Sequence, residues 1–147
     1  METSSLIRLL YVSISRVDAA EPDTELARIV AVARERNALL GVTGGLVYTG
    51  ANFAQVLEGP AQALEELMKS IHADPRHTRV DVIFSSEQPD RLFSDWLMAY
   101  SGPSQYVNAR IAPLLDDCAD ALRRRRAGDA LVHLIHGFAS EGGHAAA

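Results

Sequence analysis

Short apolar segments of two different periods fill the first hundred residues of the chain. A period of two, or a short run of branched apolar residues, indicates a strand, and apolar spacings of three and four indicate a helix. Strands are expected over residues 6–13, 43–48, 52–58, 80–84 and 96–100, and helices over residues 24–37 and 60–73. This β-α-β-β-α-β-β order favours an α+β fold, a ferredoxin-like sheet with both helices on one face.

Cap and turn residues support several of these boundaries. Asp23 is the expected N-cap of the first helix, and Gly41 is expected to end it. Thr49-Gly50-Ala51 is a hairpin connection, and Pro60 suits the first turn of the second helix. Asp74-Pro75 should end that helix.

Two more helical segments follow the sheet, over residues 113–126 and 129–138, with Gly128 expected to separate them. Their apolar stripes comprise Leu115, Cys118 and Leu122 in the first and Leu131, Leu134, Ile135 and Phe138 in the second. We expect residues 104–140 to form a helical hairpin that covers the open face of the sheet or mediates dimerisation. Residues 141–147 are expected to be a disordered tail.

Polar side chains occupy apolar positions of this pattern. Asn37 continues the helix face of Leu26, Ile29, Val30 and Ala33, and Gln55 shares a strand face with Phe53 and Leu57. An unpaired buried amide costs about 1–3 kcal/mol, so Gln55 needs a partner. Tyr11 lies near the end of the first strand. Each residue also has an ordinary interpretation, as a core tyrosine, a helix-end asparagine and a glutamine bonded to backbone.

The last predicted strand carries the single tryptophan of the chain. Trp96, Met98 and Tyr100 should lie on one side of it, with Leu97 and Ala99 on the other. A shift of one residue in the strand start reverses every side chain. The sequence therefore leaves open whether Trp96 or Met98 faces inward.

Composition excludes several classes of function. The chain has 147 residues and a net charge of −5, which indicates one domain and argues against nucleic-acid or anionic-membrane binding. The single cysteine excludes an internal disulfide and favours a cytoplasmic location. The N-terminus is not a signal peptide, and no apolar stretch is long enough to span a membrane.

No standard catalytic motif is present, so an enzyme is not expected. Glu65 and Glu66 lie on a polar helix face. The run Arg123–Arg126 is expected at a helix C-terminus, where the macrodipole favours it, with phosphate binding as the alternative. His133 and His136 could share a metal, but a third ligand is missing, and no metal site is expected.

Four motifs together resemble the BLUF family, domains that sense blue light using flavin. They are RLLYVS with Tyr11, ERNALLGVTGGLVYTGANFAQVLEGP with Asn37 and Gln55, ADPRH with Arg76 and His77, and RLFSDWLM with Trp96 and Met98. Each is weak alone, but four in order at the right intervals, over residues 5–102, are specific. The resemblance implies a flavin-binding photosensor domain over residues 1–103, followed by a helical cap over residues 104–140 in place of a fused output domain.

The resemblance also implies a noncovalent cofactor, FAD with FMN as the alternative. The cofactor-binding positions would be Tyr11, Ile29, Val30, Asn37, Gln55, Arg76, His77 and Met98, and the photoactive ones Tyr11, Gln55, Trp96 and Met98. In the family, the tyrosine supplies an electron and a proton after excitation, and the hydrogen bonds around the glutamine rearrange. Arg36 and Ala54, which precede Asn37 and Gln55, depart from the usual family pattern.

The leading interpretation is thus a cytoplasmic blue-light photoreceptor that signals to a downstream protein partner, as a homodimer or larger homo-oligomer. A small flavin-dependent oxidoreductase is one alternative, weakened by the lack of a recognisable nicotinamide site. A flavin-free ferredoxin-like interaction module is the other, and bound flavin would exclude it.

Overall fold

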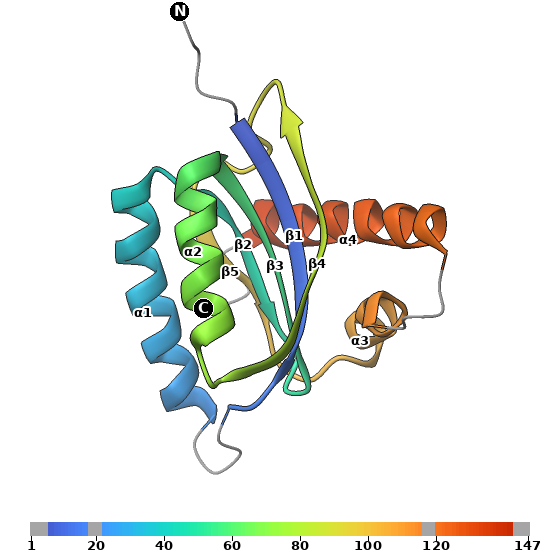
Figure 1. The fold of residues 1–147 in the computed structure, drawn as a ribbon. Coiled ribbons are helices and arrows are strands. Elements are labelled where there is room, and N and C mark those ends of the chain that lie inside the picture. Colours follow the sequence, from blue (N-terminus) through green and yellow to red (C-terminus); the bar gives the residue numbers. More distant parts are fainter. Residues whose placement is uncertain (1–5, 18–21, 116–119, 143–147) are drawn as a thin grey trace, which may run out of the picture.

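The computed structural model describes residues 6–17, 22–115 and 120–142. Its elements are β1 (Leu6–Ser15), α1 (Pro22–Leu40), β2 (Thr43–Tyr48), β3 (Asn52–Pro60), α2 (Ala61–Ala73), β4 (His77–Gln88), β5 (Trp96–Ser101), α3 (Gln105–Ile111), a short 3₁₀ turn over Ala112–Leu115, and α4 (Ala121–Gly142). Figure 1 shows their arrangement around one sheet. The predicted α+β order of strands and helices is confirmed.

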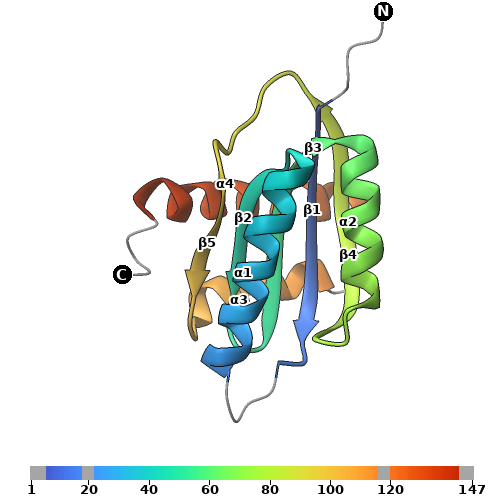
Figure 2. The ribbon, with the colours of Figure 1, turned by 90° about the vertical axis from the view of Figure 1, so that its left-hand side faces the viewer.

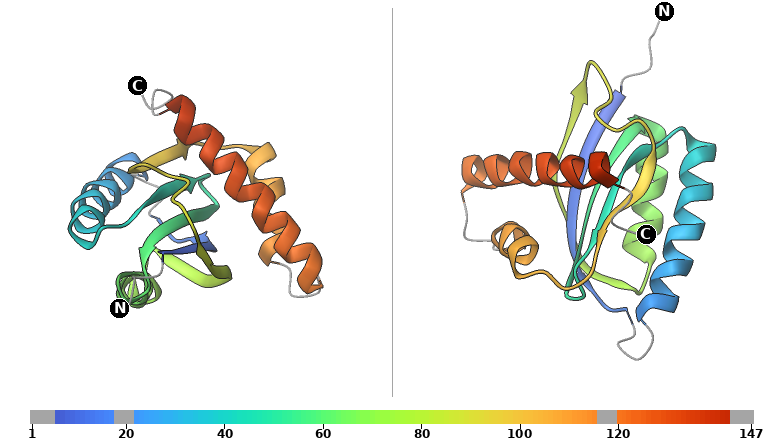
Figure 3. Two further views of the ribbon diagram at one scale, coloured as in Figure 1. Left: turned by 90° about the horizontal axis from the view of Figure 1, so that it is seen from above. Right: turned by 180° about the vertical axis from the view of Figure 1, so that it is seen from behind.

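The five strands form one sheet in the order β4-β1-β3-β2-β5. β1 lies antiparallel between β3 and β4, whereas β5 runs parallel to β2 at the sheet edge. Helices α1 and α2 cover one face, and α3 and α4 cover the other (Figures 2 and 3). This places a hydrophobic core on each side of the sheet.

Strand alternation assigns side chains to these two cores. In β1, Leu9 and Tyr11 face α1 and α2, while Leu10 and Val12 face α4. In β3, the face shared by Phe53 and Leu57 points toward α1 and α2, as the period of two predicts. The inward direction predicted for Gln55 follows from that face.

Several predicted boundaries need correction. Pro60 is the last residue of β3 and the N-cap of α2, so it does not lie in the first turn of that helix. Helix α1 begins at Pro22, so Asp23 lies in its first turn and is not its N-cap. The helix also continues past Asn37 to Leu40 and ends, as predicted, at Gly41, whose φ is +71°. β4 is longer than predicted, because polar residues at both of its ends also pair with β1.

The side-chain pattern predicted for β5 is wrong at Tyr100. The pairing of β5 with β2 shifts register between Leu46 and Val47, so one extra residue interrupts the alternation of β5. Trp96 and Met98, which precede the irregularity, both face α1 and α2. Tyr100 packs on the opposite core, with its ring stacked on Phe138 at 5.1 Å.

The C-terminal helices cover the second face of the sheet as predicted, but their boundaries differ. Gly128 does not end a helix; it lies inside α4, which crosses the strands (Figure 3). A Cβ atom on Gly128 would lie 3.0 Å from Ile83 Cγ2 and 3.4 Å from Leu10 Cδ2. Glycine thus lets the helix backbone approach the sheet closely, a role with the same sequence signal as a helix stop.

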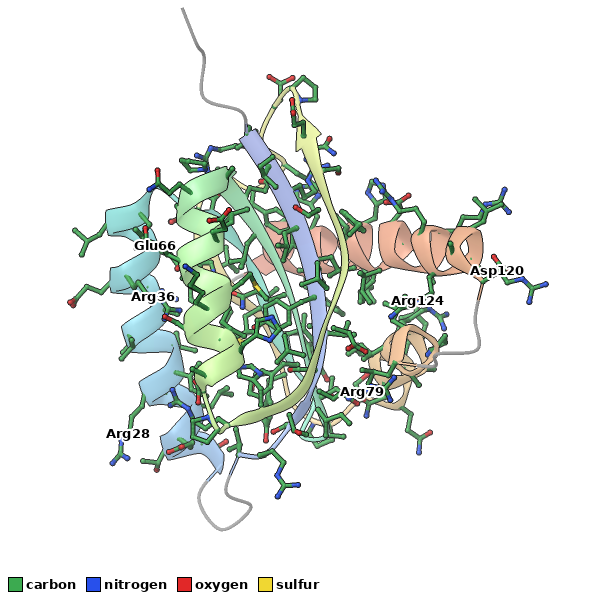
Figure 4. All side chains as sticks on the ribbon, in the orientation of Figure 1. Arg28, Arg36, Glu66, Arg79, Asp120 and Arg124 are labelled. Carbon is green, nitrogen blue, oxygen red and sulfur yellow. The ribbon has the colours of Figure 1, made fainter. Side chains whose placement is uncertain are left out.

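The arginine run Arg123–Arg126 consequently lies near the N-terminus of α4, and the macrodipole explanation is wrong. Arg124 lies between α4 and α3 (Figure 4) and donates from Nη2 to the Leu114 carbonyl oxygen at 2.7 Å. Arg125 lies 4.3 Å over the Phe84 ring. Leu122, predicted to be on an apolar stripe, is 61% exposed.

Some predictions fall on other parts of the C-terminal segment. Cys118 and residues 143–147 lie outside the described residues, while α4 extends to Gly142, into the predicted tail. Among the described residues, no helix is both long and apolar enough to cross a membrane.

Candidate functional site

A cavity lies between the sheet and helices α1 and α2. It comprises about 470 Å³ of space outside atoms, its opening to solvent included. Its walls are Tyr11, Ile29, Val32, Ala33, Arg36, Leu46, Phe53, Gln55, Ser70, Ile71, Asp74, Arg76, His77 and Trp96. The mixture of apolar walls with a few polar groups is typical of small-molecule sites.

Three side chains from three strands form a buried hydrogen-bonded chain in the cavity wall. Tyr11 of β1 lies directly opposite Gln55 of β3 in the antiparallel register, and Trp96 is the first residue of β5. Gln55 Nε2 donates to Tyr11 Oη at 2.6 Å. Trp96 Nε1 donates to Gln55 Oε1 at 2.9 Å. The structure thus places Trp96 against Gln55, the choice that the sequence left open.

The orientation of the Gln55 amide follows from this chain. An indole N–H can only donate, so the amide oxygen must face Trp96 and the amide nitrogen must face Tyr11. In the reversed orientation, the amide NH₂ would meet the indole N–H, and two donors would face each other. The Gln55 orientation and the Trp96 position are therefore coupled.

The Tyr11 phenol remains protonated at neutral pH. Burial raises the pKa of Tyr11 well above its ordinary value, and the hydrogen bond from Gln55 opposes this only in part. Tyr11 is 1% exposed. The Tyr11 hydroxyl therefore keeps a proton that it can donate within the cavity.

A neutral imidazole forms another part of the wall. The His77 ring packs on the Phe53 ring, with centroids 4.6 Å apart, and meets the Tyr11 ring edge-on at 6.0 Å. Ser13 Oγ lies 2.8 Å from His77 Nδ1, within hydrogen-bonding distance. Burial lowers the pKa of His77 to about 4, against an opposing influence of Asp74.

An ion pair joins the wall at the end of α2. Arg76 donates from Nε to Asp74 Oδ1 at 2.9 Å and from Nη2 to Oδ2 at 2.8 Å. Burial acts to raise the pKa of Asp74, but the hydrogen bonds from Arg76 outweigh it and the net pKa is lowered. The same hydrogen bonds raise the pKa of Arg76. Asp74 therefore holds the Arg76 guanidinium in a defined position.

Asn37 has no partner for its side-chain amide among the described residues. The residue is 1% exposed, and both Oδ1 and Nδ2 are buried and unpaired. The neighbouring Arg36 Nε is likewise unpaired, and Arg36 lies where α1 faces α2 (Figure 4). Leaving buried donors and acceptors unpaired costs about 1–3 kcal/mol per group. The polar edge of a flavin ring has both kinds of partner, so Asn37 fits the cofactor that the resemblance implies.

The structure gathers most, but not all, of the predicted site residues at the cavity. Tyr11, Ile29, Gln55, Arg76, His77 and Trp96 line it. Val30 and Met98 pack against the same core without lining the cavity. The assignment of Asn37 to the site rests on its unpaired amide, since it is not among the lining residues either.

Sequence reasoning missed Phe53, Asp74 and Ser13 as site residues. Phe53 could have been found, because it shares the strand face of Gln55. Asp74 was interpreted only as a helix end, and its pairing with Arg76 has no separate sequence signal. The contact of Ser13 with His77 joins residues 64 positions apart.

The two histidines considered as metal ligands offer no metal centre in the described part of the chain, where no group of three potential ligands occurs. His136 instead meets the Phe93 ring edge-on at 5.4 Å.

Comparisons with known proteins identify the family of this chain. A family profile described as BLUF, sensors of blue-light using FAD, matches residues 6–99. The photoactivated adenylate cyclase subunit beta of Euglena gracilis is 38% identical over 97 residues, which are 66% of this chain and 11% of that protein. The blue light- and temperature-regulated antirepressor BluF of Escherichia coli K12 is 35% identical over 88 residues, which are 60% of this chain and 21% of that protein.

These matches cover only part of the relatives. The chain spans about a tenth of the cyclase subunit and a fifth of the antirepressor. Among solved structures, the dark state of the BLUF protein BlrB matches with a TM-score of 0.68 and 30% identity, covering 93% of this chain and 96% of that one.

Proposed function

This chain belongs to the BLUF family, and we propose that Tyr11, Gln55 and Trp96 are the switch of a blue-light sensor that uses noncovalent flavin. One observation carries the proposal: the buried Gln55 amide joins a phenol and a donor-only indole, so it has two distinguishable orientations. The family description supports FAD over FMN.

Residues around the cavity would hold the flavin. The unpaired Asn37 amide would bind the polar edge of its ring, and Ile29, Val30 and Met98 would provide apolar contacts. Arg76, fixed by Asp74, and neutral His77 would complete the polar wall. When bound, the flavin supplies absorption of blue light and a light-dependent electron acceptor.

The change in this chain's own residues would be a reversal of the Gln55 donor and acceptor ends. Tyr11 Oη, now an acceptor from Gln55 Nε2, would then donate its proton to Gln55 Oε1. The amide NH₂ would meet the Trp96 N–H, and the contact with Trp96 would be lost. Because Trp96 begins β5, the rearrangement would pass to that strand at the sheet edge.

We infer that the chain itself is a sensor and not an enzyme, acting in the cytoplasm on a protein partner or through its own homo-oligomer. The photosensor would comprise residues 1–103, and residues 104–140 would form the cap that receives the signal. The contact between Tyr100 of β5 and Phe138 of α4 supports this division of roles.

An absorption spectrum before and after blue light tests the proposal. The purified protein should be yellow, shift slightly to the red on illumination and recover in the dark. A protein that cannot be loaded with FAD would contradict the proposal and favour a flavin-free interaction module. Steady oxidation of NAD(P)H would favour an oxidoreductase. Sizing chromatography in dark and light tests the homo-oligomer, and a monomer under both conditions would exclude it.

A further inference from the structure

A fully buried carboxylate lies near the end of β3, on the face that α4 covers. Glu58 is 0% exposed. It accepts hydrogen bonds from Arg8 Nε at 2.7 Å, from the Leu92 backbone N–H at 2.9 Å and from the Phe93 backbone N–H at 2.8 Å. Every partner is a donor, as an ionised carboxylate requires. Two of the three belong to the connection between β4 and β5.

The same connection is tied down a second time by the side chain of Arg91. Its guanidinium donates to Thr43 Oγ1 at 2.7 Å, to the Glu58 carbonyl oxygen at 3.0 Å and to the Gly41 carbonyl oxygen at 2.9 Å. The segment that precedes β5 is therefore bonded both to the start of β2 and to the end of β3.

These attachments end directly before Trp96, the member of the switch that β5 contributes. The Gly44 N–H bonds the Asp95 carbonyl oxygen at 3.0 Å, and Trp96 is the next residue. β5 is an edge strand that, among the described residues, pairs with β2 alone, so a single ladder of hydrogen bonds holds its register. The position of Trp96 along β2 thus depends on how firmly the preceding segment is held.

We propose that Glu58 is a positioning residue for the light response. Its carboxylate holds the β4–β5 connection so that Trp96 stays bonded to Gln55 in the dark and returns there after illumination. The inference rests on the proposed function, but Glu58 would act through Trp96, because Glu58 itself does not line the cavity.

A carboxylate that only paired with the charge of Arg8 would not need hydrogen bonds from the β4–β5 connection. Arg8 bonds one carboxylate oxygen, whereas the backbone N–H groups of Leu92 and Phe93 engage both. Burying a charge is costly unless all its partners are present. The geometry therefore points to the loop, and through it Trp96, as what Glu58 holds.

The test is Glu58→Gln in the flavin-loaded protein. The substitution keeps the size of the side chain but places an NH₂ group among partners that are all donors. Trp96 is the only tryptophan of the chain, so quenching of its fluorescence by acrylamide reports its exposure directly. We expect stronger quenching in the dark. We also expect a dark recovery about tenfold slower, which corresponds to an activation barrier higher by ~1.4 kcal/mol.

Glu87→Gln is the matched control, the same substitution at an exposed residue of β4, and should behave as wild type. Wild-type quenching and recovery in Glu58→Gln would overturn the proposal. If Glu58→Gln does not fold, Arg91→Ala decides instead, since Arg91 is exposed. It should change both readouts in the same direction, and wild-type behaviour would overturn the inference. A wild-type protein without a light response would contradict the proposed function, while dark quenching would still decide the role of Glu58.

Discussion

The two faces of the sheet differ in how their buried polar groups are paired. The face under α1 and α2 contains a cavity, a polar chain of Tyr11, Gln55 and Trp96, and the unpaired amide of Asn37. The face under α3 and α4 has a mainly apolar core, and its buried carboxylate, Glu58, accepts hydrogen bonds at both oxygens. Among the described residues, both ends of the Asn37 amide are unpaired on the cavity face, whereas on the other face the buried atom without a partner is Arg124 Nε.

The difference separates recognition from transmission. Buried polar groups normally find partners, so the two unpaired ends of the Asn37 amide support the flavin site that we propose on the cavity face. The other face can pass on a displacement because a close-packed core does not deform smoothly. A Cβ on Gly45 of β2 would lie 3.0 Å from Ile135 Cγ2 of α4 and 3.3 Å from Phe93, so little slack remains there.

Removing the Tyr11 hydroxyl group from the cavity face should have the largest effect. Tyr11→Phe should keep flavin bound but abolish the light-induced red shift, since the group that would donate to Gln55 is gone. Absorption spectra before and after blue light measure this. Tyr48→Phe is the control, because Tyr48 is a buried tyrosine that packs on Phe53 at 5.0 Å. A normal photocycle in Tyr11→Phe would show that the assigned role is wrong.

Removing one amide from each face should change flavin affinity in one variant and stability in the other. Asn37→Ala should weaken flavin binding about 10- to 100-fold, the equivalent of ~1–3 kcal/mol, without lowering the stability of the flavin-free protein. Asn108→Ala on α3 should lower stability and leave flavin affinity unchanged, because Asn108 Oδ1 accepts from Thr49 Oγ1. Flavin titration and denaturant unfolding measure both quantities. Equal flavin affinities in the two variants would remove Asn37 from the site.

Adding one methyl group tests the packing of the second face. Gly128→Ala should lower the free energy of unfolding by about 1–3 kcal/mol, because its Cβ would crowd Ile83 and Leu10. Gly137→Ala in the same helix, where a Cβ meets nothing within 4 Å, should raise that free energy by ~0.5–1 kcal/mol. Denaturant unfolding separates the two variants. An unchanged stability of Gly128→Ala would mean that α4 is less tightly seated.

The smallest effect should come from the pH dependence of stability through His77. Its pKa is about 4 in the folded protein against an ordinary value of 6.5. The unfolded chain therefore binds more protons between these values, so stability is complete above pH 6.5 and declines as pH falls toward 4. The loss at pH 5 should be on the order of 1 kcal/mol.

Unfolding by denaturant at pH 7 and pH 5 measures this loss. His77→Gln should reduce it, while His72→Gln, at an exposed position of α2, should retain it. If the pH dependence persists undiminished in His77→Gln, the loss has another origin.

Local periodicity was sufficient for the directions of the main site residues. The period of two in β3 predicted the inward direction of Gln55, and the helical face of α1 predicted burial of Asn37. These are properties of neighbouring residues, so they survive without knowledge of the fold. The ordered motifs then supplied the family, and with it the expected flavin.

Sequence predictions were wrong where one local pattern has two structural explanations. A glycine within a helical pattern indicates a stop or a close approach, and only the contact of α4 with Ile83 shows that Gly128 is the second case. Likewise, the irregular pairing of β5 with β2 reversed Tyr100, because alternation predicts faces only in an uninterrupted strand.

The sequence by itself determined which way Gln55 and Asn37 point, and which family the motifs resemble. The tertiary structure alone decided the partners of Gln55 and Glu58: Tyr11 and Trp96 lie 44 and 41 positions from Gln55, and Glu58 bonds residues 34 and 35 positions away. Such contacts arise only when the sheet and the β4–β5 connection close. No local pattern encodes that step, because it depends on pairing between distant strands.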